Sequence, residues 1–174
     1  MNRLDNQIAI VTGAGSGIGQ ATAIRFAQEG AKVALFDRDQ DGMQATADTI
    51  DGDCIQLEVD VTDIQSVQSA VNQVVEQYKR IDILFSGVGG SGRRWGDGPA
   101  HACTPDGWEM TIQLNLTSMF YVNKCVLQFM MEQESGSIIN LASVLGLVGG
   151  DDDFATHAYA ASKSGIIGFS RAMA

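Results

Sequence analysis

A glycine-rich stretch that follows the first apolar run constrains the fold more than any other part of the chain. The run Ile8–Thr12 leads into four glycines between positions 13 and 19, and an alanine-rich amphipathic pattern then continues to about Glu29. This order predicts a buried strand, a tight turn and the start of a helix. The free N–H groups and the positive dipole end of such a helix suit a phosphate group. The turn lacks the Gly-Lys-Ser/Thr ending of a triphosphate-binding loop, so it favours a dinucleotide.

Short apolar runs alternate with amphipathic segments along the rest of the chain. Strands are predicted at Ile8–Thr12, Lys32–Phe36, Cys54–Glu58, Ile81–Ser86 and Ser137–Leu141. Helices are predicted at Ile18–Glu29, Gln40–Ile50 and Ile64–Tyr78, as a broken pair from Pro105 to about Gln133, and from Tyr159 to the end. We expect Asp63 and Thr104 to cap two of these helices. The alternation predicts an α/β fold with a doubly wound, Rossmann-type parallel sheet and helices on both faces, and the 174 residues are expected to form a single domain, 1–174.

Composition argues against several classes of partner. The net charge is −10, from 11 basic and 21 acidic residues, so we expect neither nucleic acid nor an anionic membrane to bind. The three cysteines (Cys54, Cys103 and Cys125) and the two histidines (His101 and His157) show no metal-ligand spacing, so no metal site is expected. Cys54 and Cys125 are interpreted as core thiols, and the histidines as surface residues without a partner. The cysteine pattern favours a reduced, cytoplasmic setting.

A second group of residues suggests acid–base chemistry. Tyr159 and Lys163 are four residues apart, which places them on one face of a helix. A free tyrosine has a pKa of roughly 10, and a neighbouring ammonium stabilises the phenolate, which brings the group closer to use near neutral pH. Ser143, just beyond the strand Ser137–Leu141, would supply a hydroxyl to the same reacting oxygen. Ligands of parallel sheets bind at the carboxyl ends of strands, where the glycine turn is also expected.

These residues together resemble the short-chain dehydrogenase/reductase family. The matching stretches are Thr12–Gly19, Asp37, Asp60-Val61, Asn115, Ser143 and Tyr159–Lys163, in the family's order. The resemblance implies hydride transfer between NAD(P) and the CH–OH group of a secondary alcohol or the matching ketone. It assigns proton exchange to Tyr159, the substrate oxygen to Ser143, the nicotinamide ribose to Lys163, and a helix kink with a water relay to Asn115. It assigns cofactor contacts to Thr12, Gly13, Gly15, Ser16, Gly17, Ile18, Gly19, Asp37, Arg38, Asp60, Val61, Gly87, Tyr159 and Lys163.

The choice of cofactor depends on the end of the second strand. Asp37 can accept hydrogen bonds from the adenosine ribose and repels a 2′-phosphate, so NAD is favoured. Arg38 beside it keeps NADP as the alternative. The usual Asn-Ala-Gly of the family is replaced by Ser86-Gly87-Val88-Gly89, which removes an asparagine's contacts. A non-catalytic dinucleotide-binding or regulatory protein, and a structural interaction domain, are the competing functions.

The remaining expectations concern the loops, the partner and the chain end. Arg93, Arg94 and Trp95 are read either as contacts to a substrate carboxylate or as solvated residues, and Asp151–Asp153 as a solvated loop, with a metal role as the alternative. An apolar helical pair before Gln133 suggests a homodimer or homotetramer. The chain stops within the helix that carries Tyr159 and Lys163, where the family continues with further strands, so the sequence predicts a truncated form. The substrate is not predicted beyond a small-molecule alcohol or ketone.

Overall fold

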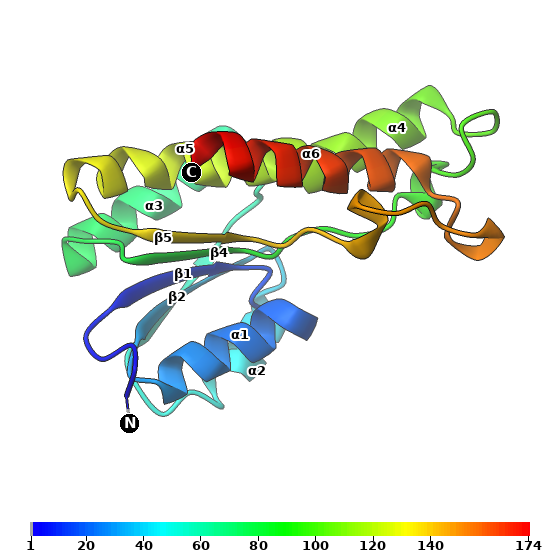
Figure 1. Ribbon diagram of the computed structural model, residues 1–174. Coiled ribbons are helices and arrows are strands. Elements are labelled where there is room, and N and C mark those ends of the chain that lie inside the picture. The colour runs from blue at the N-terminus through cyan, green and yellow to red at the C-terminus, as the bar shows by residue number, and fades with distance from the viewer. Residues whose placement is uncertain (1) are drawn as a thin grey trace. The chain divides into compact units, whose positions relative to one another are not determined.

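The computed structural model describes residues 2–174, and its elements follow the predicted alternation (Figure 1). The strands are β1 (Ile8–Thr12), β2 (Lys32–Asp37), β3 (Cys54–Glu58), β4 (Ile83–Ser86) and β5 (Ser137–Asn140). The α-helices are α1 (Gly17–Gln28), α2 (Gln40–Ala47), α3 (Ile64–Tyr78), α4 (Pro105–Ile112), α5 (Ser118–Glu132) and α6 (His157–Met173). Short 3-10 helices η1 (Arg93–Trp95), η3 (Val144–Gly146) and η4 (Asp152–Phe154) lie in loops, and η2 (Gln113–Thr117) is a π-helical segment.

The described residues form two compact units, and the first contains the sheet. This unit consists of residues 2–87 and 121–139. Its strand order is β3-β2-β1-β4-β5, and the β1–β2, β1–β4 and β2–β3 pairs are parallel. Figure 1 shows α1 and α2 on one face of the sheet and α3 and α5 on the other. The predicted doubly wound parallel α/β fold is therefore confirmed.

Burial on both faces explains why the sequences of β1 and β2 are continuous apolar runs. All of β1 is buried, as are the four inner residues of β2, because both faces of the sheet are covered by helices. Helix α3 buries Val67, Ala70, Val71 and Val74, whose spacing forms a single apolar stripe. Asp63 caps this helix by accepting a hydrogen bond from the Gln65 amide at 2.9 Å, as predicted.

The second unit consists of residues 88–120 and 140–174. Here α6 packs against α4, η2 and η3. Thr104 caps α4 through a hydrogen bond from the Gly107 amide at 2.9 Å, with Pro105 in the first turn, which confirms that prediction. The rings of Phe120 and Phe169 meet edge to face, with their centroids 6.1 Å apart. The break predicted within the Pro105–Gln133 segment is the π-helical turn η2.

Several predicted element ends were wrong by a few residues, among them both ends of α1, at Gly17 and Gln28, and the end of β2, at Asp37. Strand β4 begins at Ile83 because the Ile81 amide is bonded instead to Gln133 Oε1 at 2.9 Å. Helix α2 ends at Ala47, since the Thr49 and Ile50 amides bond in tighter i to i−3 turns. Strand β5 ends at Asn140, and α6 begins at His157 rather than Tyr159.

Candidate active site

The predicted phosphate-binding turn connects β1 to α1 in the first unit. Gly13 adopts a φ of 73° and Gly17 a φ of 56°, in the left-handed region that favours glycine. A β-carbon on Gly19 would overlap the carbonyl of Gly13, so only glycine allows this close approach of helix and strand. Ser16 makes no side-chain cap bond, and the first turn of α1 holds no acidic residue. This end of α1 therefore presents uncapped amides to a ligand, and its geometry fits a diphosphate.

Asp37 lies at the carboxyl end of β2 and shapes the same turn. Its Oδ2 accepts a hydrogen bond from the Gly15 amide at 2.9 Å, and its Oδ1 accepts one from the Asp39 amide at 3.0 Å. The carboxylate is thus held against the glycine turn by two backbone donors. This places a fixed negative charge beside the expected adenosine end of a dinucleotide.

The other cofactor-binding candidates follow the neighbouring strands. Thr12, at the end of β1, accepts a hydrogen bond from the Gly87 amide at 3.0 Å through its Oγ1. Asp60 follows β3, and its Oδ1 accepts bonds from the Thr62 amide and hydroxyl at 2.8 and 2.6 Å. These bonds lower the pKa of Asp60, and the positive charge of Arg38 adds to the effect. Val61 is buried beside it. Thr12, Asp60, Val61 and Gly87 follow or end their strands at the carboxyl edge of the sheet, where parallel α/β sheets bind ligands.

Tyr159 and Lys163 lie in the second unit, on one face of α6. The Lys163 Nζ is 5.6 Å from the centroid of the Tyr159 ring. Lys163 is only 2% exposed, and its Nζ donates a hydrogen bond to the Leu141 carbonyl at 2.7 Å. Burial lowers the pKa of Lys163 to about 8, because removal from water disfavours the ammonium. The structure therefore brings this pair together as predicted and adds a partner, Leu141, that the sequence did not reveal.

Asn115 sits in the π-helical turn and is fully buried. Its Nδ2 donates to the carbonyls of Gly90 and Thr111, both at 2.9 Å, and its Oδ1 accepts from the Gly90 amide at 3.0 Å. A β-carbon on Gly89 would lie 2.6 Å from this Oδ1 and 3.1 Å from the Lys163 Nζ. Gly89 therefore leaves room for both side chains, a role that the sequence alone did not show. A π-helical segment lies where the kink was predicted, and Asn115 bonds from it to Gly90 and Thr111.

Ser143 caps the short helix η3 in the same unit. Its hydroxyl accepts a hydrogen bond from the Leu145 amide at 3.2 Å, and the side chain is half-buried. The hydroxyl proton stays available for a second oxygen. A β-carbon on Gly146 would press against the backbone of Lys163, so η3 packs directly on α6.

Several loop residues differ from their predicted environments. The interpretation of His157 as a residue without a partner is wrong, because its Nδ1 accepts a hydrogen bond from the Ala100 amide at 2.9 Å. Arg93 donates to the Asp153 carbonyl, and Arg94 stacks on Trp95 at 4.0 Å. Cys125 is buried as predicted, whereas Cys54 is only half-buried.

Asp97 is the functional candidate that sequence reasoning missed. Its carboxylate accepts hydrogen bonds from the Ala158 and Tyr159 amides, at 3.0 and 3.1 Å. The flanking glycines, Gly96 and Gly98, signal a turn, but no local pattern identifies partners that lie so far away in the sequence.

Two further kinds of feature are absent from the part of the chain that the structure describes. Within residues 2–174, no group of three or more His, Cys, Asp or Glu side chains is arranged to hold a metal ion. No helix in this part of the chain is long and apolar enough to cross a bilayer.

The comparisons with known proteins agree with this geometry. The chain belongs to the short-chain dehydrogenase family, whose model matches residues 7–174. It is 35% identical over 175 residues to 3-oxoacyl-(acyl-carrier-protein) reductase from Thermotoga maritima, covering 99% of this chain and 68% of that protein. It is 37% identical to D-threitol dehydrogenase from Mycolicibacterium smegmatis, covering 99% of this chain and 65% of that protein.

The chain is also similar to a solved structure that contains NAD. Carveol dehydrogenase from Mycobacterium avium in complex with NAD superposes with a TM-score of 0.91 at 30% identity, covering 100% of this chain and 66% of that one. The chain thus spans about two thirds of the length of these relatives.

Proposed function

We propose that the protein is an NAD-dependent oxidoreductase that interconverts a secondary alcohol and a ketone, with Tyr159 as its acid and base. The burial of Lys163 beside the Tyr159 ring is the observation that carries this proposal. A buried ammonium without a carboxylate partner is unfavourable for stability, and Lys163 forms no ion pair within residues 2–174. Buried charged groups of this kind are concentrated at active sites, where a shifted pKa serves catalysis.

The first unit supplies the residues proposed to hold the cofactor. The uncapped amides of the Gly13–Gly19 turn would bind the diphosphate, and Ser16, Gly17 and Ile18 are exposed there. Asp37 would accept hydrogen bonds from the adenosine ribose, and its fixed negative charge favours NAD over NADP. Arg38 keeps NADP as the alternative. When bound, the nicotinamide supplies hydride transfer.

The second unit supplies the proposed proton chemistry. Tyr159 gives a proton to the ketone oxygen, or takes one from the alcohol, at its phenolic oxygen. The Lys163 ammonium stabilises the phenolate that remains. The Ser143 hydroxyl donates to the substrate oxygen and orients it. Asn115 acts through the backbone, because its side chain bonds to Gly90 and, within the π-helical segment, to the Thr111 carbonyl.

The partner and setting of the protein stay predictions. Exposed apolar side chains on α4 and α5, such as Trp108, Met110 and Phe120, support the proposed homodimer or homotetramer. The three free cysteines support a reducing, cytoplasmic environment.

Substituting Tyr159 by phenylalanine tests the proposal directly. The purified protein is assayed with NAD or NADP against a panel of secondary alcohols and ketones, and turnover is followed by NADH absorbance. Tyr159→Phe is expected to lower kcat at least about a hundredfold, because it removes the group that transfers the proton. NADH affinity, measured by fluorescence titration, should stay largely intact, because most of the proposed cofactor contacts lie outside Tyr159. Tyr78→Phe is the matched control, since it removes a hydroxyl that bonds to Asp53 in the other unit.

The outcomes separate the competing functions. Equal turnover by Tyr159→Phe and the parent would refute the mechanism. NADH binding without turnover of any substrate would favour a non-catalytic dinucleotide-binding protein. Failure to bind NADH at all would favour a structural interaction domain.

A further inference from the structure

The N-terminus of α6 has no cap from its own residues. Thr156 stands at the N-cap position, yet its side chain makes no cap hydrogen bond. The first hydrogen bond within the helix runs from the Ala160 amide to the Thr156 carbonyl, at 3.0 Å. The amides of His157, Ala158 and Tyr159 therefore have no acceptor inside the helix.

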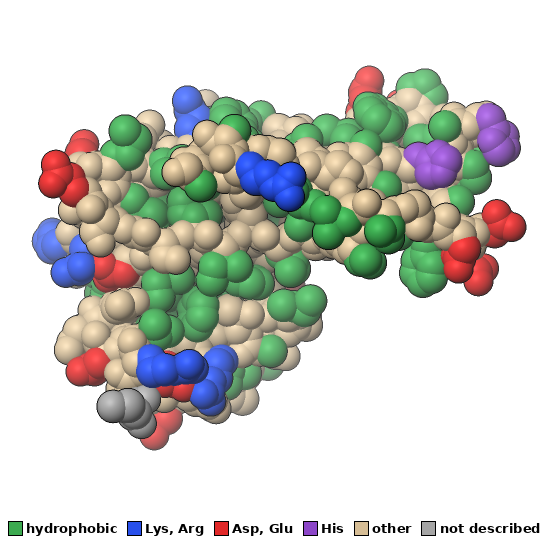
Figure 2. Space-filling view, viewed as in Figure 1, with side chains coloured by type: hydrophobic (Ala, Val, Ile, Leu, Met, Phe, Trp, Pro, Cys, Tyr) green, Lys and Arg blue, Asp and Glu red, His purple; other side chains and the backbone are tan. Residues whose placement is uncertain are grey.

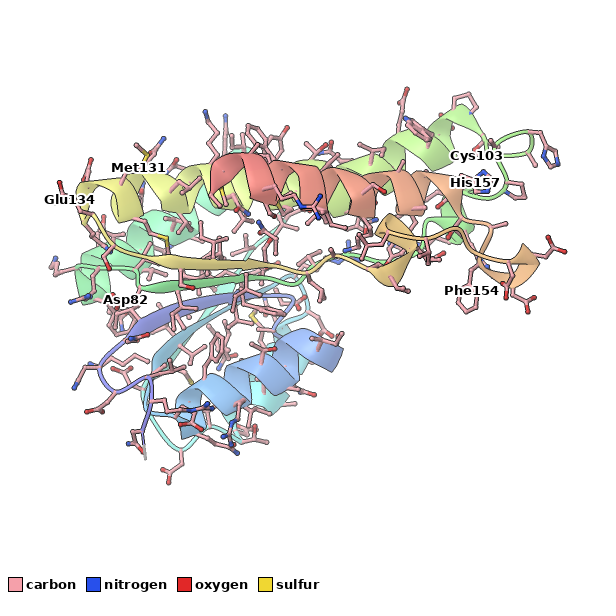
Figure 3. All side chains as sticks on the ribbon, in the orientation of Figure 1. Asp82, Cys103, Met131, Glu134, Phe154 and His157 are labelled. Atoms are coloured by element: carbon pink, nitrogen blue, oxygen red, sulfur yellow. The ribbon has the colours of Figure 1, made fainter. Side chains whose placement is uncertain are left out.

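A loop from elsewhere in the chain satisfies all three amides. This loop, Asp97–Ala100, is named here the remote cap. Its Gly98 carbonyl accepts from the His157 amide at 3.1 Å, and the two carboxylate oxygens of Asp97 accept from Ala158 and Tyr159 at 3.0 and 3.1 Å. In return, the Ala100 amide donates to His157 Nδ1 at 2.9 Å. Figure 3 shows His157 where α6 begins, beside the loop that carries Cys103, and both histidines, purple in Figure 2, lie at this end.

The remote cap is itself firmly held. Asp97 is only 6% exposed, and its amide donates to the Gly92 carbonyl at 3.1 Å. Gly96, which precedes it, has a φ of 99°, and a β-carbon there would lie 2.5 Å from Thr104 Oγ1. A β-carbon on Gly107, in the first turn of α4, would lie only 2.4 Å from the carbonyl carbon of Gly96, so α4 packs tightly on the loop. The start of α4 thus supports the start of α6.

Asp97 suits this position better than an uncharged residue would. A carboxylate offers two acceptor oxygens, one for each of the two amides, and a helix N-terminus favours negative charge. Within residues 2–174, Asp97 forms no ion pair, so the helix end is its charge partner.

We propose that the remote cap fixes the first turn of α6 and thereby positions the Tyr159 phenol. The inference rests on the proposed function for the role of that phenol. Tyr159 lies in the first turn, which frays when its amides lose their acceptors. Asp97 is therefore a positioning residue, which acts through the backbone of Tyr159 and touches no substrate.

The test compares Asp97→Ala and Asp97→Asn with the parent protein. Loss of a helix cap shifts the equilibrium between the ordered and the frayed first turn roughly tenfold, so Asp97→Ala should lower kcat by up to about tenfold, the full factor applying when the frayed form predominates in the variant. NADH affinity should stay at the parental value. Asp97→Asn keeps one carbonyl oxygen as an acceptor and should recover part of the lost kcat. Amide hydrogen exchange at Ala158 and Tyr159 should be faster in Asp97→Ala by about tenfold, with Ile166 in the middle of α6 unchanged.

A matched control removes a different aspartate cap. Asp63→Ala deletes the side chain that caps α3, a helix that carries no proposed catalytic residue. This variant should lose a comparable amount of stability and keep the parental kcat, which separates positioning from general destabilisation.

Each result has a defined consequence. Parental kcat in Asp97→Ala, or unchanged exchange at Ala158 and Tyr159, would overturn the remote cap. A fall in kcat of the same size in Asp63→Ala would also overturn it. If the parent turns over no substrate while Asp97→Ala still exchanges faster at these two amides, the cap is supported and the proposed function fails.

Discussion

Replacing Lys163 by methionine is expected to stabilise the protein while it abolishes turnover. Methionine is similar in length and apolar, so it can fill the buried site without a charge. In the parent, burial lowers the pKa of Lys163 from 10.5 to about 8. A shift of this size corresponds to about 3 kcal/mol against the charged form in the folded state. The bond from Lys163 to the Leu141 carbonyl offsets about 1–2 kcal/mol of this, and that contribution is lost in the variant. The net gain is therefore about 1–2 kcal/mol near pH 7.

The pH dependence of this gain has a definite sign. Below a pH of about 8, Lys163 is charged in both states, so the full desolvation cost lowers the stability of the folded parent. Between about 8 and 10.5 the unfolded chain binds the extra proton, so the free energy of unfolding of the parent rises with pH. The advantage of Lys163→Met should shrink across this interval.

Urea unfolding near pH 7 and again near pH 10 measures both effects. Fluorescence is a suitable signal, because Trp95 and Trp108 both lie in the same unit as Lys163. Lys124→Met, on the exposed side of α5, is the control and should change stability by less than about 0.5 kcal/mol. A variant of Lys163 that is less stable than the parent near pH 7 would refute the reasoning, because the contacts of the ammonium would then outweigh its desolvation.

Two further substitutions test the turn and the buried amide. Gly19→Ala should lower the free energy of unfolding by about 2 kcal/mol and weaken NADH binding at least about tenfold, because the added β-carbon overlaps a backbone carbonyl of the turn. Thermal unfolding and NADH titration measure the two effects. Gly52→Ala is the control and should change neither quantity, because the space around Gly52 is open. Asn115→Ala should lower the free energy of unfolding by about 2–4 kcal/mol, since it leaves both backbone groups of Gly90 without their partner. Exposed Asn72→Ala is its control, and equal Tm values for the two variants would contradict the assignment.

Local pattern was sufficient to predict the sheet and most of its helices. Residues of β1 and β2 are buried on both faces, so their apolar runs identify them without any long-range information. Asp63 and Thr104 were predicted as caps because a cap acts on amides two or three residues away. The glycine turn was likewise predictable, since Gly13 and Gly19 serve contacts within a few residues of each other.

Contacts between distant residues explain what the sequence did not reveal. The start of α6 was misplaced because its amides bond to Asp97 and Gly98, some 60 residues earlier in the chain. The partner of His157 was missed for the same reason. Lys163 was predicted beside Tyr159 from helical spacing alone, whereas its burial and its bond to Leu141 depend on how η3 and α6 pack.

The hydrogen bonds between Asn115 and Gly90 have a consequence for loop engineering. The side-chain amide offers Gly90 one donor and one acceptor, the same pair that an adjacent strand would offer. The segment after β4 is therefore anchored twice, at Gly90 by Asn115 and at Asp97 by the first turn of α6, so a grafted loop must keep both anchors. A transplanted loop joined after Gly90 keeps this anchor, whereas one joined before Gly89 must supply a glycine at that position, because a β-carbon there would lie 2.6 Å from the Asn115 Oδ1.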